Sequence, residues 1–95
     1  MNGTTVGFVV RLLRVELAQS AFKHGVEEDD IEHAVSNAMV IEDLDDDLRL
    51  YLGPNRRAAL LEVITLLREE PDVELVIHAM PMRAKYQRLL PGGDT

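Results

Sequence analysis

The residues best suited to chemistry gather near the end of the sequence, where His78 is followed by Arg83, Lys85 and Tyr86. Cleavage of RNA needs a proton acceptor for the 2′-hydroxyl, a proton donor for the leaving oxygen and positive charge beside the phosphate. An imidazole, two cationic side chains and a phenol can supply these functions. The spacing therefore predicts a catalytic group at residues 78–86. The alternative is a half-buried histidine that only forms a hydrogen bond with a helix.

Other cationic positions have both a structural and a functional interpretation. Lys23 and His24 precede a glycine, and cations in the last turn of a helix stabilise its negative end. The functional alternative adds both residues to the catalytic group. Arg56 and Arg57 lie in a predicted loop, where paired arginines either face solvent or clamp phosphate. Together with Arg88, on the solvent side of the final segment, they are the candidate nucleic-acid-binding residues.

No metal or cofactor is predicted. The chain has no cysteine, and its three histidines, His24, His33 and His78, lack the short spacings typical of metal ligands. It has no glycine-rich phosphate loop, no serine nucleophile elbow and no H-E-x-x-H motif. We therefore expect any activity to be independent of metal.

Length and composition indicate one small domain. The 95 residues, 46% apolar and 28% charged, leave no room for a second domain, since a domain typically takes about 100 to 200 residues. We expect the domain at residues 6–90, with flexible termini at residues 1–5 and 91–95. A homodimer or another partner would stabilise so small a core. Apolar runs fall far short of the roughly 18 residues of a membrane span, and no secretory signal opens the chain, which predicts a cytoplasmic protein without membrane contact.

Charge is distributed unevenly along the chain. The net charge is -7, yet residues 27–47 hold ten acidic residues without a Lys or Arg, and the remainder has ten basic residues against seven acidic ones. The acidic segment is either a solvated helix face and turn or a docking surface for a basic protein. The basic remainder is compatible with RNA.

Patterning predicts a mixed first half. Residues 8–17 fit both a helical stripe and the alternation of a strand, and their β-branched content favours a strand that ends near Leu17. A short helix should follow at residues 18–24, ended by Gly25. The next helix, at residues 27–38, has acidic residues at its start, with Asp29 and Glu32 at the spacing of a capping box.

The second half predicts an antiparallel sheet. Strands are expected at residues 39–44 and 48–52 around an acidic turn, then at residues 58–67 and 73–80, before an amphipathic helix at residues 82–90. In the last strand, His78 should share a face with Glu74, Val76 and Met80. The fold predicted is α+β: an antiparallel four-stranded meander sheet with N-terminal helices and a C-terminal helix packed on it.

The order of these pieces resembles the BrnT-type toxins of bacterial type II toxin–antitoxin modules. The likeness covers residues 15–90 and is carried by KHGV (residues 23–26), IEHAVSNA (31–38), LRLYLGPNRRAALLEVI (48–64) and VIHAMPMRAKYQRLL (76–90). Lys23, His24, Arg83 and Tyr86 stand where the family's motifs have matching residues. The role of His78 comes from its chemistry, because the family's last strand ends differently.

The resemblance implies a RelE-like fold and a metal-independent endoribonuclease, active or inactive. Its partners would be RNA and a cognate antitoxin protein, for which a ribbon-helix-helix protein is one candidate. The alternative is a non-catalytic interaction module that binds a protein through a sheet edge or through its acidic helix. The RelE-like fold, the endoribonuclease activity and the antitoxin partner are expected from the resemblance and not from composition or spacing.

Overall fold

The computed structural model describes residues 6–10, 13–69 and 72–92; the residues 1–5 and 93–95 predicted to be flexible lie outside this part. Six strands form one mixed sheet in the order β1-β2-β6-β5-β4-β3, in which β2 and β6 are parallel and the other neighbours antiparallel. The elements are β1 (Val6–Val10), β2 (Leu13–Leu17), η1 (Gln19–Phe22), α1 (Glu28–Ser36), β3 (Val40–Asp43), β4 (Leu48–Pro54), β5 (Leu60–Arg68), β6 (Val73–Pro81) and η2 (Ala84–Leu89).

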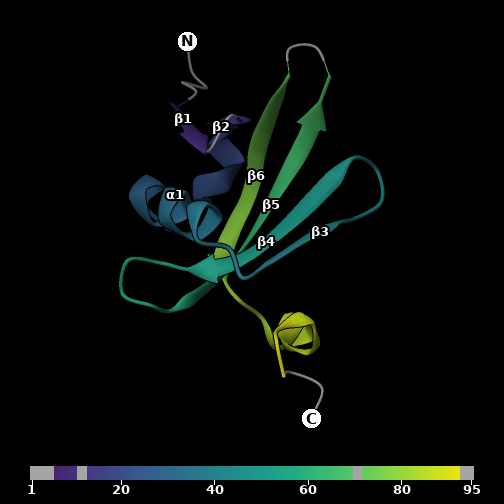
Figure 1. The fold of residues 1–95 in the computed structure, drawn as a ribbon. Coiled ribbons are helices and arrows are strands. Elements are labelled where there is room, and N and C mark those ends of the chain that lie inside the picture. Colours follow the sequence, from purple (N-terminus) through teal and green to yellow (C-terminus); the bar gives the residue numbers. More distant parts are fainter. Residues whose placement is uncertain (1–5, 11–12, 70–71, 93–95) are drawn as a thin grey trace.

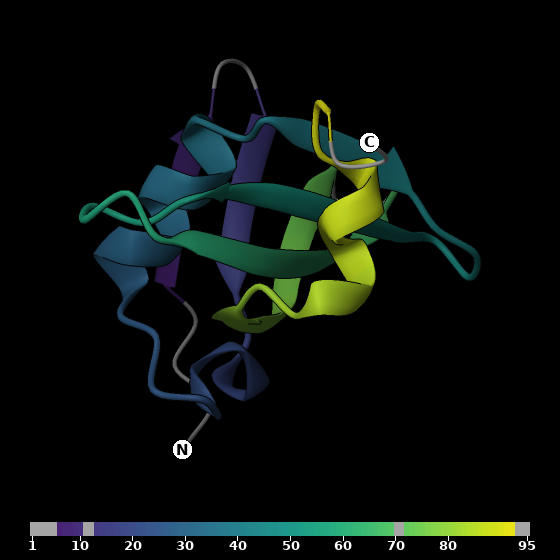
Figure 2. The same cartoon turned by 90° about the horizontal axis from the view of Figure 1, so that it is seen from below.

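The α+β class is confirmed, while the predicted sheet is too small. Strands β3, β4, β5 and β6 pair in sequence as antiparallel neighbours, but the sheet as a whole is neither four-stranded nor purely antiparallel. The curved sheet brings β1 and β2 steeply across β4 and β5 (Figure 2).

The two additional strands come from the ambiguous N-terminal segment. The strand interpretation of residues 8–17 is confirmed, but the segment forms two strands that pair with each other, with Phe8 opposite Val15. Strand β2 then lies parallel to the first half of β6, and the Ala18 amide donates to the Val76 carbonyl oxygen at 2.9 Å. The second half of β6 is thereby left open to η1.

Both N-terminal helices are shorter than predicted. The first is a single 3-10 turn, followed by Gly25 with a φ of 78°, a value that favours glycine. The second, α1, begins after Glu27, whose side chain forms no capping hydrogen bond. The predicted capping box is therefore wrong, because Asp29 already lies inside the first turn. The acidic residues there still face the positive end of the helix dipole.

Helix α1 packs closely on the sheet (Figure 1). It buries Ile31, Ala34 and Val35, and a Cβ atom at Gly53 of β4 would lie 2.1 Å from the Ala34 carbonyl oxygen. A glycine is thus required where the helix crosses the strand. The core on this face of the sheet comprises Val15, Leu17, Ala21, Ile31, Ala34, Val35, Tyr51, Leu61, Val63, Val76 and Ala79.

A β-bulge in β6 corrects the predicted side-chain faces. Thr65 pairs with Val76, but Ile64 pairs with His78, so the register shifts by one residue between them. Because one extra residue reverses the alternation, Val76 joins the core beneath α1 while His78 lies on the opposite face. The prediction that both share a face is wrong.

The C-terminal segment forms a shorter helix than predicted and one of another type. This helix, η2, is a 3-10 helix with no buried residue, and it crosses β4 and β5 on the side of the sheet away from α1 (Figures 1 and 2). Its exposed and half-buried positions nevertheless follow the predicted amphipathic pattern, with Tyr86 and Leu89 half-buried and Lys85 and Arg88 exposed. Among the described residues, no helix is long and apolar enough to cross a membrane.

Candidate active site

A buried carboxylate joins the predicted catalytic residues. Glu62 lies near the start of β5, between Leu61 and Val63 of the core, and its exposed fraction is 0%. Its Oε2 accepts hydrogen bonds from His78 Nε2 at 2.9 Å and from Arg83 Nη2 at 2.6 Å, and its Oε1 accepts one from the Arg83 backbone amide at 2.9 Å. Strands β5 and β6 and the start of the C-terminal segment thus meet at one carboxylate.

The charge of Glu62 decides which ring nitrogen of His78 carries a proton. Burial alone would raise the pKa of Glu62, but hydrogen bonds from the Arg83 guanidinium and backbone amide, and from His78, outweigh it and hold the pKa below its ordinary value. An ionised carboxylate only accepts hydrogen bonds, so His78 Nε2 must carry a proton. When the ring is neutral, its lone pair is on Nδ1, which is where a general base needs it.

His24 lies beside His78, although a helix and several strands separate them in the sequence. The Ser20 hydroxyl in η1 donates to the Ile77 carbonyl oxygen at 2.8 Å and anchors this turn on the open half of β6. The two imidazole rings consequently meet edge to face, with centroids 5.5 Å apart and an interplanar angle of 75°. The molecule therefore has two adjacent imidazoles, of which one is held by a carboxylate.

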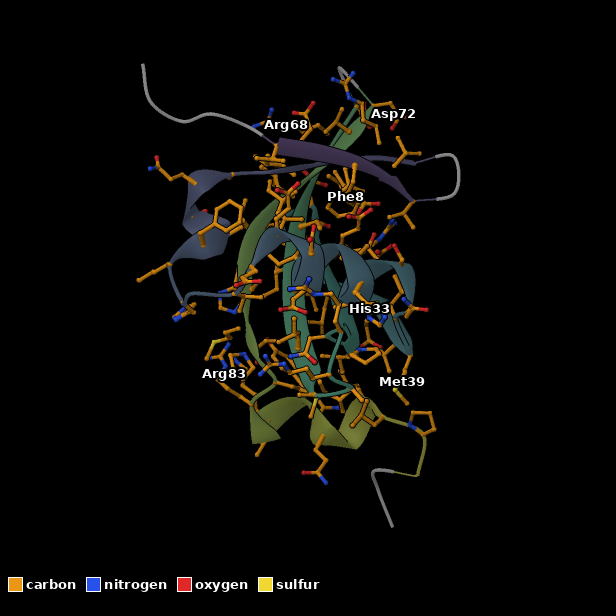
Figure 3. The ribbon with its side chains drawn as sticks, turned by 90° about the vertical axis from the view of Figure 1, so that its left-hand side faces the viewer. Phe8, His33, Met39, Arg68, Asp72 and Arg83 are labelled. Carbon is orange, nitrogen blue, oxygen red and sulfur yellow. The ribbon has the colours of Figure 1, made fainter. Side chains whose placement is uncertain are left out.

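Two cationic side chains and a phenol form a second cluster, which Arg83 joins to His78 through their shared partner Glu62. Arg83 Cζ and Lys85 Nζ lie 5.9 Å and 5.0 Å from the centroid of the Tyr86 ring. The Arg83 side chain is 45% exposed, and its hydrogen bond with Glu62 raises its pKa. Figure 3 shows Arg83 where β6 passes into the C-terminal segment, at the opposite end of the sheet from Arg68 and Asp72.

The remaining cationic candidates separate into two groups. Arg56 is occupied by acidic residues of the α1 start, with Nε 2.9 Å from Asp30 Oδ1 and Nη2 2.8 Å from Glu27 Oε1, which leaves it poorly placed to clamp phosphate. The other group is exposed and makes no ion pair within the described residues: Lys23, Arg57, Lys85 and Arg88. Lys23 is adjacent to His24, whereas Arg88 lies at the far end of η2.

Sequence reasoning missed Glu62. A signal was present, because this residue interrupts the apolar run of residues 58–67, which was predicted to form a buried strand. A charged residue is almost never fully buried unless it is paired. The hydrogen-bond partners of Glu62 could be identified only once the pairing of β5 with β6 was known.

A second buried carboxylate lies on the α1 face of the sheet. Glu74 is 3% exposed and accepts hydrogen bonds from Tyr51 at 2.5 Å, Thr65 at 2.8 Å and Arg49 at 2.9 Å. Arg49 also binds Asp43 Oδ1 at 2.6 Å. Burial and then the bond with Glu74 raise the pKa of Tyr51, so this phenol stays protonated. Glu74 and its three partners thus form one hydrogen-bonded network, and no imidazole takes part.

Metal ligands do not gather in the structure. In residues 6–10, 13–69 and 72–92, no group of three or more His, Asp or Glu side chains could hold an ion. The third histidine, His33, donates from Nδ1 to the Pro54 carbonyl oxygen at 2.8 Å. His24 and His78 contact each other edge to face.

Comparison of the chain with protein-family models, with curated proteins and with solved structures found no match.

Proposed function

We propose that the chain is a metal-independent endoribonuclease of the toxin type, with its active site at His24, His78 and Arg83. The observation that carries this proposal is the pair of adjacent imidazoles, 5.5 Å apart, of which His78 is fixed by Glu62. Cleavage of RNA by transfer to its own 2′-hydroxyl needs one base and one acid on either side of a phosphate. Two imidazoles can take these two roles.

The reaction follows from the protonation states. His78 Nδ1 removes the proton of the 2′-hydroxyl, and the 2′-oxygen then bonds to phosphorus. As the bond from phosphorus to the 5′-oxygen breaks, His24 in its protonated form donates a proton to that oxygen. The products are a 2′,3′-cyclic phosphate and a free 5′-hydroxyl.

Charge stabilisation comes from the cations at the edge of this site. Arg83 is exposed on one side while Glu62 holds the other, so its guanidinium is positioned before the substrate arrives. Lys85 makes no ion pair within the described residues and is the second candidate to contact phosphate. Glu62 is a positioning residue, because its oxygens are already occupied by His78 and Arg83.

The test uses a labelled RNA oligonucleotide and the purified full chain. We expect cleavage that persists in EDTA and that ends in a 2′,3′-cyclic phosphate, with His78→Ala and Arg83→Ala each lowering the rate by roughly 10²-fold or more. Arg68→Ala is the matched control, because this arginine is exposed at the opposite end of the sheet from Arg83 (Figure 3), and the same oligonucleotide with 2′-deoxyribose should not be cut. Retained activity in both site variants would refute the assignment.

The same proposal covers the fold family, the partners and the compartment. Four consecutive antiparallel strands with a preceding helix support a RelE-like core, to which β1 and β2 would be an addition. A toxin of this type would act on cytoplasmic RNA and be held by an antitoxin protein. Both the antitoxin and a homodimer are part of this proposal.

A protein-binding module is the second candidate, and the edge strand β3 favours it. Met39 and Ile41 are 54% and 52% exposed beside this edge, next to the acidic residues of the β3–β4 turn. An added strand with basic side chains would match the open edge and its charge. If the folded chain cuts no RNA, this candidate replaces the first, and Ile41→Arg should then abolish partner binding.

A further inference from the structure

A groove opens beside the imidazole pair, and His24 is the member of the pair that lines it. It lies where the η1–α1 connection meets the turn between β4 and β5, and its volume is about 590 Å³. Pockets that bind small molecules typically have about 300 to 1,000 Å³. In Figure 2, the η1–α1 connection and the β4–β5 turn extend on the same side of the sheet. The groove is therefore large enough for one unit of a polymer whose backbone reaches the imidazoles.

The floor and the inner end of the groove differ in chemistry. Val26, Leu61 and Pro81 line it with apolar surface, and His24 lines it as well. His24 contacts His78 at a centroid distance of 5.5 Å. A ring bound on the apolar floor would thus lie next to the proposed acid of the cleavage reaction, where the His24 imidazole is the side chain on which an unpaired RNA base could stack.

The rim carries charges of both signs. Glu27 and Asp30 lie opposite Arg56 and Arg57, and Arg56 is already bound to both carboxylates at 2.8 Å and 2.9 Å. The bond with Arg56 also lowers the pKa of Asp30, so this carboxylate remains an acceptor. Arg57 differs, because it is exposed and makes no ion pair within the described residues. The groove thus offers carboxylate oxygens as hydrogen-bond acceptors and one guanidinium without an ion pair.

We propose that this groove binds one nucleotide of single-stranded RNA next to the bond that is cut. The base lies on the apolar floor, its N–H groups donate to the carboxylates of Glu27 or Asp30, and Arg57 contacts the neighbouring phosphate. Guanine presents adjacent N–H donors to a carboxylate, whereas uracil presents a single donor between two oxygens. Guanine is therefore the preferred base. This inference rests on the proposed RNA cleavage for its biological meaning, but the binding itself does not need catalysis.

The experiment is a titration of the full chain with guanosine 3′-monophosphate and uridine 3′-monophosphate, followed by backbone NMR. Saturable shifts are expected at Gly25, Val26 and Arg57, with roughly tenfold tighter binding of the guanosine nucleotide, the effect of about 1.4 kcal/mol. Arg57→Ala should weaken both nucleotides by about five- to tenfold. Glu27→Gln, at an exposed side chain, should reduce the preference for guanosine.

The controls separate this inference from the proposed function. Arg68→Ala, at an exposed arginine outside the groove, should bind both nucleotides with wild-type affinity. Shifts confined to Arg83 and Lys85, or wild-type affinity of the Arg57→Ala variant for both nucleotides, would overturn the groove assignment even if RNA is cut. Saturable, guanosine-selective binding in the groove by a chain that cuts no RNA would sustain the groove and refute the ribonuclease.

Discussion

Within the described part of the chain, two buried carboxylates lie on adjacent strands, and they differ in what surrounds them. Glu74 is enclosed by Tyr51, Thr65 and Arg49 beneath α1, whereas Glu62 binds His78 and Arg83 on the opposite face. Both are charged groups in a small protein, and both have an arginine partner. The comparison teaches that burial and pairing alone do not indicate a functional site.

The partners decide the difference. Around Glu74 the side chains of Tyr51 and Thr65 are themselves buried, and Arg49 is shared with Asp43. Around Glu62, the side chains of His78 and Arg83 are 24% and 45% exposed, so each presents an unoccupied side to solvent. In the Glu74 network only Arg49 is partly exposed, at 28%, and its guanidinium already binds two carboxylates. In the proposed reaction, the exposed sides of His78 and Arg83 are the ones that would face RNA.

The largest expected effect separates the two carboxylates by activity. Glu62→Gln should lower the rate of RNA cleavage by roughly 10²-fold, because the substitution removes the negative charge, and an amide that can donate as well as accept no longer fixes the His78 tautomer. Glu74→Gln should leave the rate of the folded protein within about threefold, since no imidazole touches that site. Single-turnover cleavage at a temperature where both variants are folded measures this.

The pH dependence of the rate tests whether Glu62 positions His78. If it does, the pH–rate profile of Glu62→Gln should shift relative to wild type. A purely structural loss would lower the rate without shifting the profile. A Glu74→Gln variant that loses activity as strongly as Glu62→Gln would show that the two networks are not functionally distinct.

The comparison also shows which parts of the structure were accessible from sequence. The hairpin around residues 45–47 was predictable because its strands alternate cleanly, and Asp46 and Asp47 adopt the positive φ of 63° that such tight turns require. The strand preference of the N-terminal segment was predictable from its β-branched residues. Its division into two strands was not, because periodicity does not reveal where a chain reverses.

The site was predictable in its ingredients and not in its assembly. His78, Arg83 and His24 were identified by residue type, but Glu62 joins them only through the pairing of β5 with β6. The bulge at Ile77 then separates His78 from Val76, although strict alternation places both on one face. The pairing of Arg56 with the start of α1 likewise depends on tertiary contacts.

A smaller effect concerns stability, where the order of the two carboxylates reverses. Glu74→Ala should lower the free energy of unfolding by about 3 to 5 kcal/mol, because it leaves buried hydroxyl groups of Tyr51 and Thr65 without an acceptor. Glu62→Ala should cost less, about 1 to 3 kcal/mol, since His78 and Arg83 can turn to water. Urea denaturation of both variants measures the difference. Equal losses would mean that exposure of the partners does not matter.

The smallest expected effects are the pH limits of the two networks, which lie at opposite ends of the scale. The pKa of Glu62 is lowered from 4.5, so its contribution to stability is complete above that pH and is lost as the pH falls through the folded-state pKa. The free-energy difference between wild type and Glu62→Gln should therefore shrink on acidification. A difference that stays constant to the acid transition would contradict a bound, ionised Glu62.

At the alkaline end the Glu74 network should fail first. The pKa of Tyr51 is raised from 10.0, so its contribution is complete below that pH and is lost as the pH rises through the folded-state value, because the unfolded chain ionises earlier. At neutral pH, Tyr51→Phe should cost about 1 kcal/mol for the lost hydrogen bond. Above pH 10 this cost should diminish, because phenylalanine cannot ionise in the unfolded chain. Chemical denaturation of both proteins at several alkaline pH values measures the trend, and parallel curves would show that Tyr51 is not held protonated by burial and Glu74.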